Sequence, residues 1–215
     1  MSNFFPINLN IQGRKCLVIG GGKVAERKVE SLLQCGADIY LVSPKVTQNL
    51  EKLAGEGAIK LINREYNPDD LDGCFLVISA TNDQQVNHNV AYDCLLRNIL
   101  INVVDDPDKC NFTVPSVLRR GSLCIAVSTD GKSPILAKKI REELEEHFGV
   151  EYAEFLDLMG EIREQVMRDI PDEKKRIMIF KCLIDSGILD LIRKGNKELV
   201  SKQVAECISL GFIIK

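Results

Sequence analysis

Histidine is scarce in this chain of 215 residues, which contains only His88 and His147. Both fall in stretches with helical spacing, and we interpret both as surface residues, so we predict no metal site. None of the eight cysteines forms a C-x-x-C pair. Neither a structural zinc site nor a disulfide framework is therefore expected, and most cysteines are interpreted as small buried hydrophobic residues.

The sequence also lacks an apolar run long enough to span a bilayer and an N-terminal segment with a secretion pattern. We therefore expect a cytoplasmic protein without a membrane partner. The net charge is −3, so the chain also lacks an excess of positive charge. This argues against a dedicated nucleic-acid-binding protein. The apolar fraction of 45% and the charged fraction of 27% are typical of a globular protein with a core.

A glycine-rich stretch follows the first strongly apolar segment. Residues 16–19 form a short apolar run, three glycines interrupt it, and apolar residues with helical spacing follow up to Gly36. Gly20, Gly22 and Ala25 occupy the three small-residue positions of a G-x-G-x-x-A motif. This pattern predicts a dinucleotide site whose phosphates lie at the N-terminus of a helix, although a plain strand-to-helix turn remains the alternative.

Strand and helix patterns alternate up to about residue 112. This alternation predicts a Rossmann-type, doubly wound parallel sheet in an α/β fold, with a further N-terminal strand over residues 1–12. The predicted strands of the sheet are residues 16–19, 38–42, 59–62, 74–80 and 100–104, and the predicted helices between them include 46–54 and 84–97.

The carboxyl ends of parallel strands meet at one edge, where ligands bind. The acidic residue often found after the second strand is replaced by Ser43, Pro44 and Lys45. Ser43 can bond a ribose hydroxyl, whereas Lys45 can tolerate a 2′-phosphate, so NAD and NADP both remain open, with NAD preferred. The predicted cofactor-binding residues are Gly20, Gly21, Gly22, Lys23, Val24, Ser43, Pro44, Lys45, Thr81, Asn82 and Val104.

Two carboxylates, Asp105 and Asp106, follow the last predicted strand of the sheet. Their sequence, Asp-Asp-Pro, is typical of a turn. A carboxylate at this edge can also serve as a general base. The residues alone leave these two interpretations open.

The pattern changes after residue 112. Residues 112–118 and 123–128 predict a β-hairpin, and Ser133 with Pro134 predicts the start of a helix. The run 123–127 is apolar on both faces, which favours cover by a second subunit. We therefore divide the chain into an NAD-binding domain (1–112), a dimerisation segment (113–150) and a small C-terminal helical bundle (151–215).

Four segments in order resemble the precorrin-2 dehydrogenase family, which includes the N-terminal module of siroheme synthases. They are VIGGGKVAERK at 18–28, NVVDDP at 102–107, CNFTVPS at 110–116 and VSTDGKSPILAKKIR at 127–141. The resemblance implies oxidation of precorrin-2 to sirohydrochlorin with NAD, by a homodimer. Some members also insert ferrous iron. We expect no trifunctional enzyme, because no methyltransferase domain follows.

The resemblance also implies roles for individual residues. Asp105, rather than Asp106, corresponds to the family's key aspartate and is the predicted catalytic base. The Ser128 and Thr129 positions lie near the tetrapyrrole in the family, and Thr129 stands where some members carry a phosphorylatable serine. The predicted substrate-binding residues are Asn102, Asn111, Ser128, Thr129, Ser133 and Arg120.

Several basic residues follow the sheet and can hold the substrate's carboxylates or simply form a solvated face. They are Arg119, Arg120, Lys132, Lys138 and Arg141. Three functional hypotheses remain at this point. The leading one is a dehydrogenase, the second is a dehydrogenase that is also a ferrochelatase, and the third is a dinucleotide-sensing regulator without turnover.

Overall fold

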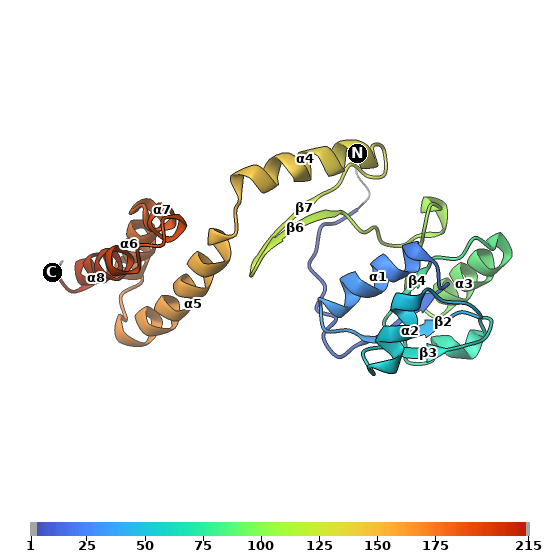
Figure 1. The fold of residues 1–215 in the computed structure, drawn as a ribbon. Helices are drawn as coiled ribbons and strands as arrows, with labels where there is room; N and C mark the ends of the chain where they lie inside the picture. Colours follow the sequence, from blue (N-terminus) through green and yellow to red (C-terminus); the bar gives the residue numbers. More distant parts are fainter. Residues whose placement is uncertain (1–3, 214–215) are drawn as a thin grey trace. The chain divides into compact units, whose positions relative to one another are not determined.

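The computed structural model describes residues 4–213, and these residues divide into two compact units, with the boundary between Val114 and Pro115 (Figure 1). The first unit alternates strands and helices, as the sequence predicts. Its elements are β1 (Lys15–Ile19), α1 (Lys23–Leu33), β2 (Asp38–Val42), α2 (Gln48–Gly55), β3 (Lys60–Ile62), η1 (Pro68–Leu71), β4 (Leu76–Ser79), α3 (Gln84–Leu96), β5 (Leu100–Val103) and η2 (Pro107–Lys109).

The five strands of the first unit form one parallel sheet with the order β3-β2-β1-β4-β5. The chain leaves β1 toward β2 and β3 and then crosses to β4 on the other side of β1. This reversal lies between β1 and β4, which is the position where doubly wound sheets bind dinucleotides. The predicted α/β fold is therefore confirmed, with slightly different strand ends.

Helices cover both faces of this sheet. Because alternate strand residues point to opposite faces, each strand packs against both helical layers. Cys16 and Val18 of β1 pack in one core with Val29 of α1 and Leu50 of α2. On the other face, residues of β1, β4 and β5 pack against α3 and η1. These strands are apolar on both faces because the sheet lies between two helical layers.

The predicted N-terminal strand is wrong over the residues that the structure describes. Residues 4–11 have no strand conformation, and Phe5 is 84% exposed. Only Ile11 reaches the core, just before a turn in which Arg14 N donates to Ile11 O. Alternating apolar residues form a strand only where a neighbouring strand offers hydrogen bonds, and no strand pairs with this segment. Residues 1–3 of the predicted strand lie outside the described part.

The second unit begins with an antiparallel hairpin of β6 (Ser116–Arg120) and β7 (Leu123–Val127). Gly121 in its two-residue turn has φ +56°, and a Cβ atom there would lie 2.9 Å from Ala153 Cβ. The predicted helix follows as α4 (Pro134–His147), with Ser133 as its N-cap and Pro134 as its first residue. The turn of the hairpin is therefore shorter than predicted, because Arg119 and Arg120 belong to β6, and the first strand begins at Ser116 rather than at residue 112.

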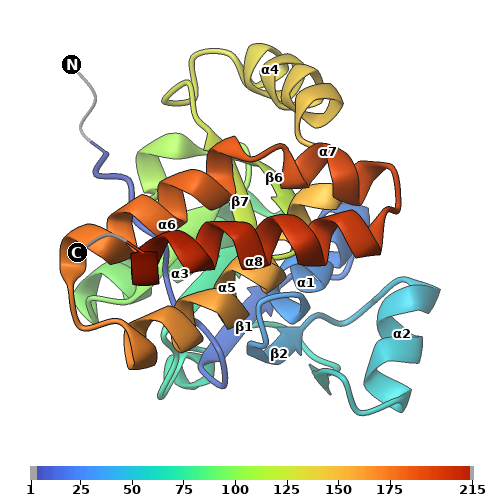
Figure 2. The same cartoon turned by 90° about the vertical axis from the view of Figure 1, so that its left-hand side faces the viewer.

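Four helices complete the second unit, namely α5 (Glu151–Asp169), α6 (Glu173–Asp185), α7 (Ile188–Arg193) and α8 (Lys197–Ile213). Their core contains Ile162 of α5, Ile179 of α6, Ile188 of α7 and Cys207 of α8. Figure 2 shows α6 and α8 side by side, and these two helices contact each other. None of the helices in residues 4–213 is long and apolar enough to cross a membrane.

One disulfide, between Cys182 of α6 and Cys207 of α8, corrects the sequence-based view of the cysteines. The two residues are 25 positions apart and meet only because the helices pack together. Spacing in the sequence does not reveal such a pair. Of the remaining cysteines in the described region, Cys16 and Cys94 are buried, whereas Cys124 is exposed.

Candidate active site

The glycine loop, residues 20–22, lies where β1 ends beside β4. Gly20 has φ +106°, and a Cβ atom on it would lie 2.4 Å from the carbonyl oxygen of Ala80. Gly22 is the N-cap of α1 and carries no side chain that would satisfy the first N–H groups of the helix. A Cβ atom on Gly22 would meet nothing within 4 Å. The loop therefore presents free N–H groups and open space at a positive helix end, which fits a pyrophosphate.

The β2–α2 loop, residues 43–47, packs on the glycine loop. A Cβ atom on Gly21 would lie 2.0 Å from Lys45 O, and Thr47 N donates to Gly21 O at 3.0 Å. Ser43 is buried, and its hydroxyl donates to Lys45 O at 2.7 Å. The structure thus brings Ser43, Pro44 and Lys45 beside the glycine loop. Their contacts with a cofactor stay a prediction.

The ends of β4 and β5 lie at the same edge of the sheet. Ala80 N donates to Ile19 O at 2.7 Å, and Val104 N donates to Ser79 O at 2.9 Å. The Thr81 hydroxyl accepts a hydrogen bond from Asp83 N at 3.2 Å and shapes the turn before α3, while Asn82 is exposed. The predicted cofactor residues from four different strand ends therefore converge, although their contacts with a cofactor stay a prediction.

Asp105 follows β5 at this edge in a left-handed conformation, with φ +62°. Such a conformation is uncommon for a residue other than glycine, and it often marks a functional position. The residue is exposed. Its neighbour Asp106 instead forms an ion pair with Lys109 at 2.5 Å. The structure therefore distinguishes the two carboxylates, since Asp106 is paired within the turn and Asp105 faces solvent.

Lys28 of α1 was not among the predicted site residues. Burial lowers the pKa of its ammonium group, Arg27 lowers it further, and the Asp105 carboxylate opposes both effects. A positive charge on α1 therefore lies within electrostatic reach of the proposed base. The sequence carries Lys28 inside the glycine motif, but only the fold shows that α1 directs it toward the end of β5.

Asn102 and Asn111 use their side-chain amides within the first unit. The side chain of Asn111 forms two hydrogen bonds with the backbone at the edge of β5. Its Oδ1 accepts from Ile101 N at 2.7 Å, and its Nδ2 donates to Ile99 O at 2.9 Å. Asn102 Nδ2 donates to Phe112 O at 3.2 Å. Both residues therefore hold the segment after β5 in place, and their substrate contacts stay a prediction.

The loop before α4 contains three of the predicted substrate-binding hydroxyls. Ser128 accepts from Asp130 N at 3.2 Å, Thr129 accepts from Ser133 N at 3.1 Å, and Ser133 accepts from Leu136 N at 3.3 Å. Each hydroxyl acts as an acceptor in these bonds and therefore keeps its own hydrogen for donation to a ligand carboxylate.

The predicted basic cluster is partly engaged within the second unit. Arg120 Nε donates to Phe148 O at 3.0 Å, which supports the end of α4. Arg141 forms an ion pair with Glu145, and Lys138 lies 3.6 Å from Glu142. These partners lower the positive charge available to a ligand, and a substrate contact of Arg120 stays a prediction.

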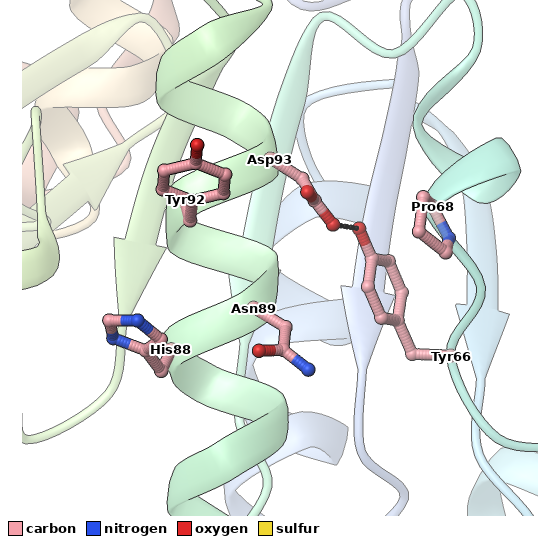
Figure 3. A pocket seen from close by; sticks show the side chains of 6 residues that line it. All are labelled: Tyr66, Pro68, His88, Asn89, Tyr92 and Asp93. Atoms are coloured by element: carbon pink, nitrogen blue, oxygen red, sulfur yellow. Dashed lines mark hydrogen bonds between the residues drawn. The ribbon is translucent and has the colours of Figure 1, made fainter.

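A surface pocket of about 390 Å³ lies beside α3, and none of its lining residues belongs to the predicted site. In Figure 3, Tyr66 and Asp93 point toward each other, and the tyrosine hydroxyl donates to the carboxylate at 2.9 Å. Burial and this carboxylate raise the pKa of Tyr66. The remaining lining residues are Pro68, His88, Asn89 and Tyr92. Within residues 4–213, no three His, Cys, Asp or Glu side chains are placed to hold a metal ion.

Two family models match the chain. The family described as putative NAD(P)-binding matches residues 7–116, which include the whole parallel sheet. The family described as sirohaem biosynthesis protein, central, matches residues 120–147, which include β7 and α4.

Curated relatives match nearly the whole chain. A siroheme synthase of Methylobacillus flagellatus is 35% identical over 204 residues, which cover 95% of this chain and 44% of the relative. A siroheme synthase of Thioalkalivibrio sulfidiphilus is 34% identical over 209 residues, covering 97% of this chain and 43% of the relative. The chain thus spans less than half the length of the curated relatives it matches.

A solved structure is similar over nearly the whole length of both chains. It is that of SirC, precorrin-2 dehydrogenase, with a TM-score of 0.79 and 28% identity over 96% of this chain and 99% of the other. These matches agree with the sequence motifs, with the strand order of the sheet and with the geometry of the glycine loop. The chain belongs to the putative NAD(P)-binding family, and it is similar to siroheme synthases and to SirC, precorrin-2 dehydrogenase, as its motifs predict.

Proposed function

We propose that this protein oxidises precorrin-2 to sirohydrochlorin with NAD. The observation that carries the proposal is the placement of Asp105, exposed and left-handed, at the same sheet edge as a glycine loop that fits a pyrophosphate. The similarity to SirC, precorrin-2 dehydrogenase, supports the substrate. The match to siroheme synthases supports the pathway.

The residues of this chain have distinct parts in the reaction. The glycine loop and the N-terminus of α1 bind the pyrophosphate, and the β2–α2 loop lies where the adenosine ribose binds. Bound NAD supplies the acceptor for the hydride that the substrate loses. Asp105 takes the proton that leaves the substrate carbon and passes it to solvent.

The second unit contributes groups that suit a substrate with many carboxylates. The hydroxyls of Ser128, Thr129 and Ser133 can each donate a hydrogen bond, and the backbone N–H of Ile135 lies in the first turn of α4, next to Ser133. These groups favour anionic ligands over neutral ones. We propose that they hold carboxylate side chains of the tetrapyrrole.

We further propose that the chain acts as a homodimer through the hairpin and α4, the segment 113–150. On one face of the hairpin, Cys124 and Ala126 of β7 are exposed, and Ile135 of α4 is 83% exposed. A strand that is apolar on both faces but covered on one favours burial against a second copy. Residues 151–215 form a separate helical domain in this proposal, and the location is cytoplasmic.

The direct experiment is to incubate the purified protein with precorrin-2 and NAD under anaerobic conditions. We expect the sirohydrochlorin spectrum to develop together with NADH. NADH without sirohydrochlorin, or no spectral change at all, would contradict the proposal. Stable binding of NAD without any effect of the tetrapyrrole would instead favour a dinucleotide-sensing regulator.

A further inference from the structure

A buried carboxylate, that of Glu26, joins the start of α1 to the start of α2. Glu26 lies in the first turn of α1 and is 9% exposed. Its carboxylate accepts a short hydrogen bond from the Thr47 hydroxyl and forms an ion pair with Lys23 at 3.1 Å. The Thr47 hydroxyl, and next Lys23, hold the pKa of Glu26 below its usual range, so the group is charged at neutral pH.

Thr47 connects this carboxylate to the dinucleotide site. Its hydroxyl oxygen caps α2 by accepting from Leu50 N at 3.4 Å, and its backbone N–H donates to Gly21 O at 3.0 Å. Gly21 also lies directly against the carbonyl oxygen of Lys45. Glu26 therefore holds the β2–α2 loop at the residue through which that loop contacts the glycine loop.

The β2–α2 loop is the part of such a sheet that distinguishes one dinucleotide from another. An acidic residue after the second strand commonly bonds the 2′-hydroxyl of the adenosine ribose and excludes a 2′-phosphate. This chain has Ser43 there, and its hydroxyl hydrogen is used on Lys45 O. The loop itself therefore carries no acidic side chain, and Glu26 brings a carboxylate to it from a different helix.

Without Glu26, the same loop would have the features of a phosphate site. The N-terminus of α2 is a positive helix end, and Lys23 and Lys45 add two ammonium groups near it. Glu26 pairs with Lys23 and places a negative charge at Thr47, the N-cap of α2. This negative charge repels a second anion, such as a 2′-phosphate, that would bind at the same loop.

We propose that Glu26 is a specificity-determining residue, which holds the β2–α2 loop on the glycine loop and repels a 2′-phosphate. The site then prefers a dinucleotide with a free 2′-hydroxyl. This inference rests on the proposed function in one respect, namely that a dinucleotide binds at the glycine loop. It assigns to α1 the discrimination that an acidic residue after β2 performs in other sheets.

The test is equilibrium binding of NADH and NADPH to the full-length chain, followed by nicotinamide fluorescence. Glu26→Gln keeps the size and a hydrogen-bond acceptor but removes the charge. We expect NADPH affinity to rise relative to NADH affinity by on the order of 10-fold in this variant. An unchanged ratio of the two dissociation constants would overturn the inference.

Thr47→Val is the matched control, because it removes the hydroxyl while the Glu26 charge remains. We expect both dinucleotides to bind more weakly by a similar factor, and Thr47→Ser to restore them. If Thr47→Val changes the ratio as much as Glu26→Gln, discrimination follows the position of the loop rather than the charge, and the inference is wrong.

A second measurement on the unmodified chain covers the case in which Glu26→Gln does not fold. In the unmodified chain, NADH should bind more tightly than NADPH. Equal affinities, or tighter binding of NADPH, would contradict the inference. If NADH binds but the ratio fails these tests, only the inference falls, whereas binding of neither dinucleotide would overturn the proposed function with it.

Discussion

The β-sheets of the two units differ in how completely each is covered by other parts of its own unit. In the first unit, the middle strands β1 and β4 lie between two helical layers, and Leu17 and Val77 are fully buried. In the second unit, the hairpin is covered on one face, and α4 exposes Ile135 and Leu136. The parallel sheet is therefore covered on both faces within the first unit, while the hairpin of the second unit leaves one face open.

The same contrast appears in the polar groups. The strand ends of the first unit bring a glycine loop, a serine and an aspartate together from segments far apart in the sequence. The groups offered by the second unit lie in one short loop, residues 128–133, with hydrogen bonds between near neighbours. Cofactor binding thus depends on the topology of the sheet, whereas the proposed carboxylate contacts depend on a local turn.

The largest effect that we expect is on catalysis, from Asp105→Asn. Loss of the base should lower kcat by about 100- to 10,000-fold. NADH affinity should be almost unchanged, because Asp105 does not belong to the pyrophosphate or ribose contacts. Steady-state kinetics with precorrin-2 and a separate binding titration would measure both.

Asp106→Asn is the control for that experiment. Asp106 is paired with Lys109, so its loss should loosen the turn and leave kcat within a few-fold of the original. Equal loss of activity in both variants would mean that the turn, rather than a specific base, matters.

The next effect concerns the stability of the first unit. Gly21→Ala would place a Cβ atom 2.0 Å from Lys45 O, and we expect a loss of about 3 kcal/mol in the free energy of unfolding. Gly22→Ala meets no neighbour and should cost less than about 1 kcal/mol. Urea unfolding of the two variants would measure both free energies. Similar losses of stability in both variants would show that the β2–α2 loop moves away from the added Cβ atom at little cost.

In the second unit, a comparable effect should come from the disulfide. Reduction, or Cys182→Ser, opens a loop of 25 residues and should lower the free energy of unfolding by about 3 kcal/mol. Cys124→Ser, at an exposed position, should have almost no effect. Titration of free thiols in the native and unfolded protein would check the pairing, and eight reactive thiols without reductant would refute it.

The smallest expected effect on the folded chain itself comes from Ala126→Glu on the open face of the hairpin. A charge there should weaken the proposed dimer without unfolding the protein, since the side chain is exposed in the single chain. Light scattering over a range of concentrations would show the change. Lys202→Glu, on an exposed position of α8, should leave the mass unchanged.

The sequence predicts those parts of the structure that depend on neighbouring residues. The turn from β1 into α1, the five parallel strands and the cap at Ser133 all follow from local patterns. The N-terminal segment shows the limit, because alternation does not reveal whether a partner strand is available to Phe5 and Ile7. The site is similar in this respect, since the contact of Glu26 with Thr47 and the electrostatic influence of Asp105 on Lys28 both depend on the packing of α1.

The most direct test of the proposed oxidation follows the transferred hydrogen. Precorrin-2 carrying deuterium at the carbons that lose hydrogen would be incubated with NAD and the protein, and the nicotinamide product analysed by mass spectrometry. We expect each NADH formed to carry one deuterium and NADH to appear at the same rate as sirohydrochlorin. With Asp105→Asn, we expect almost no NADH to form. Sirohydrochlorin that forms equally fast without NAD, or NADH without deuterium, would contradict the proposed reaction.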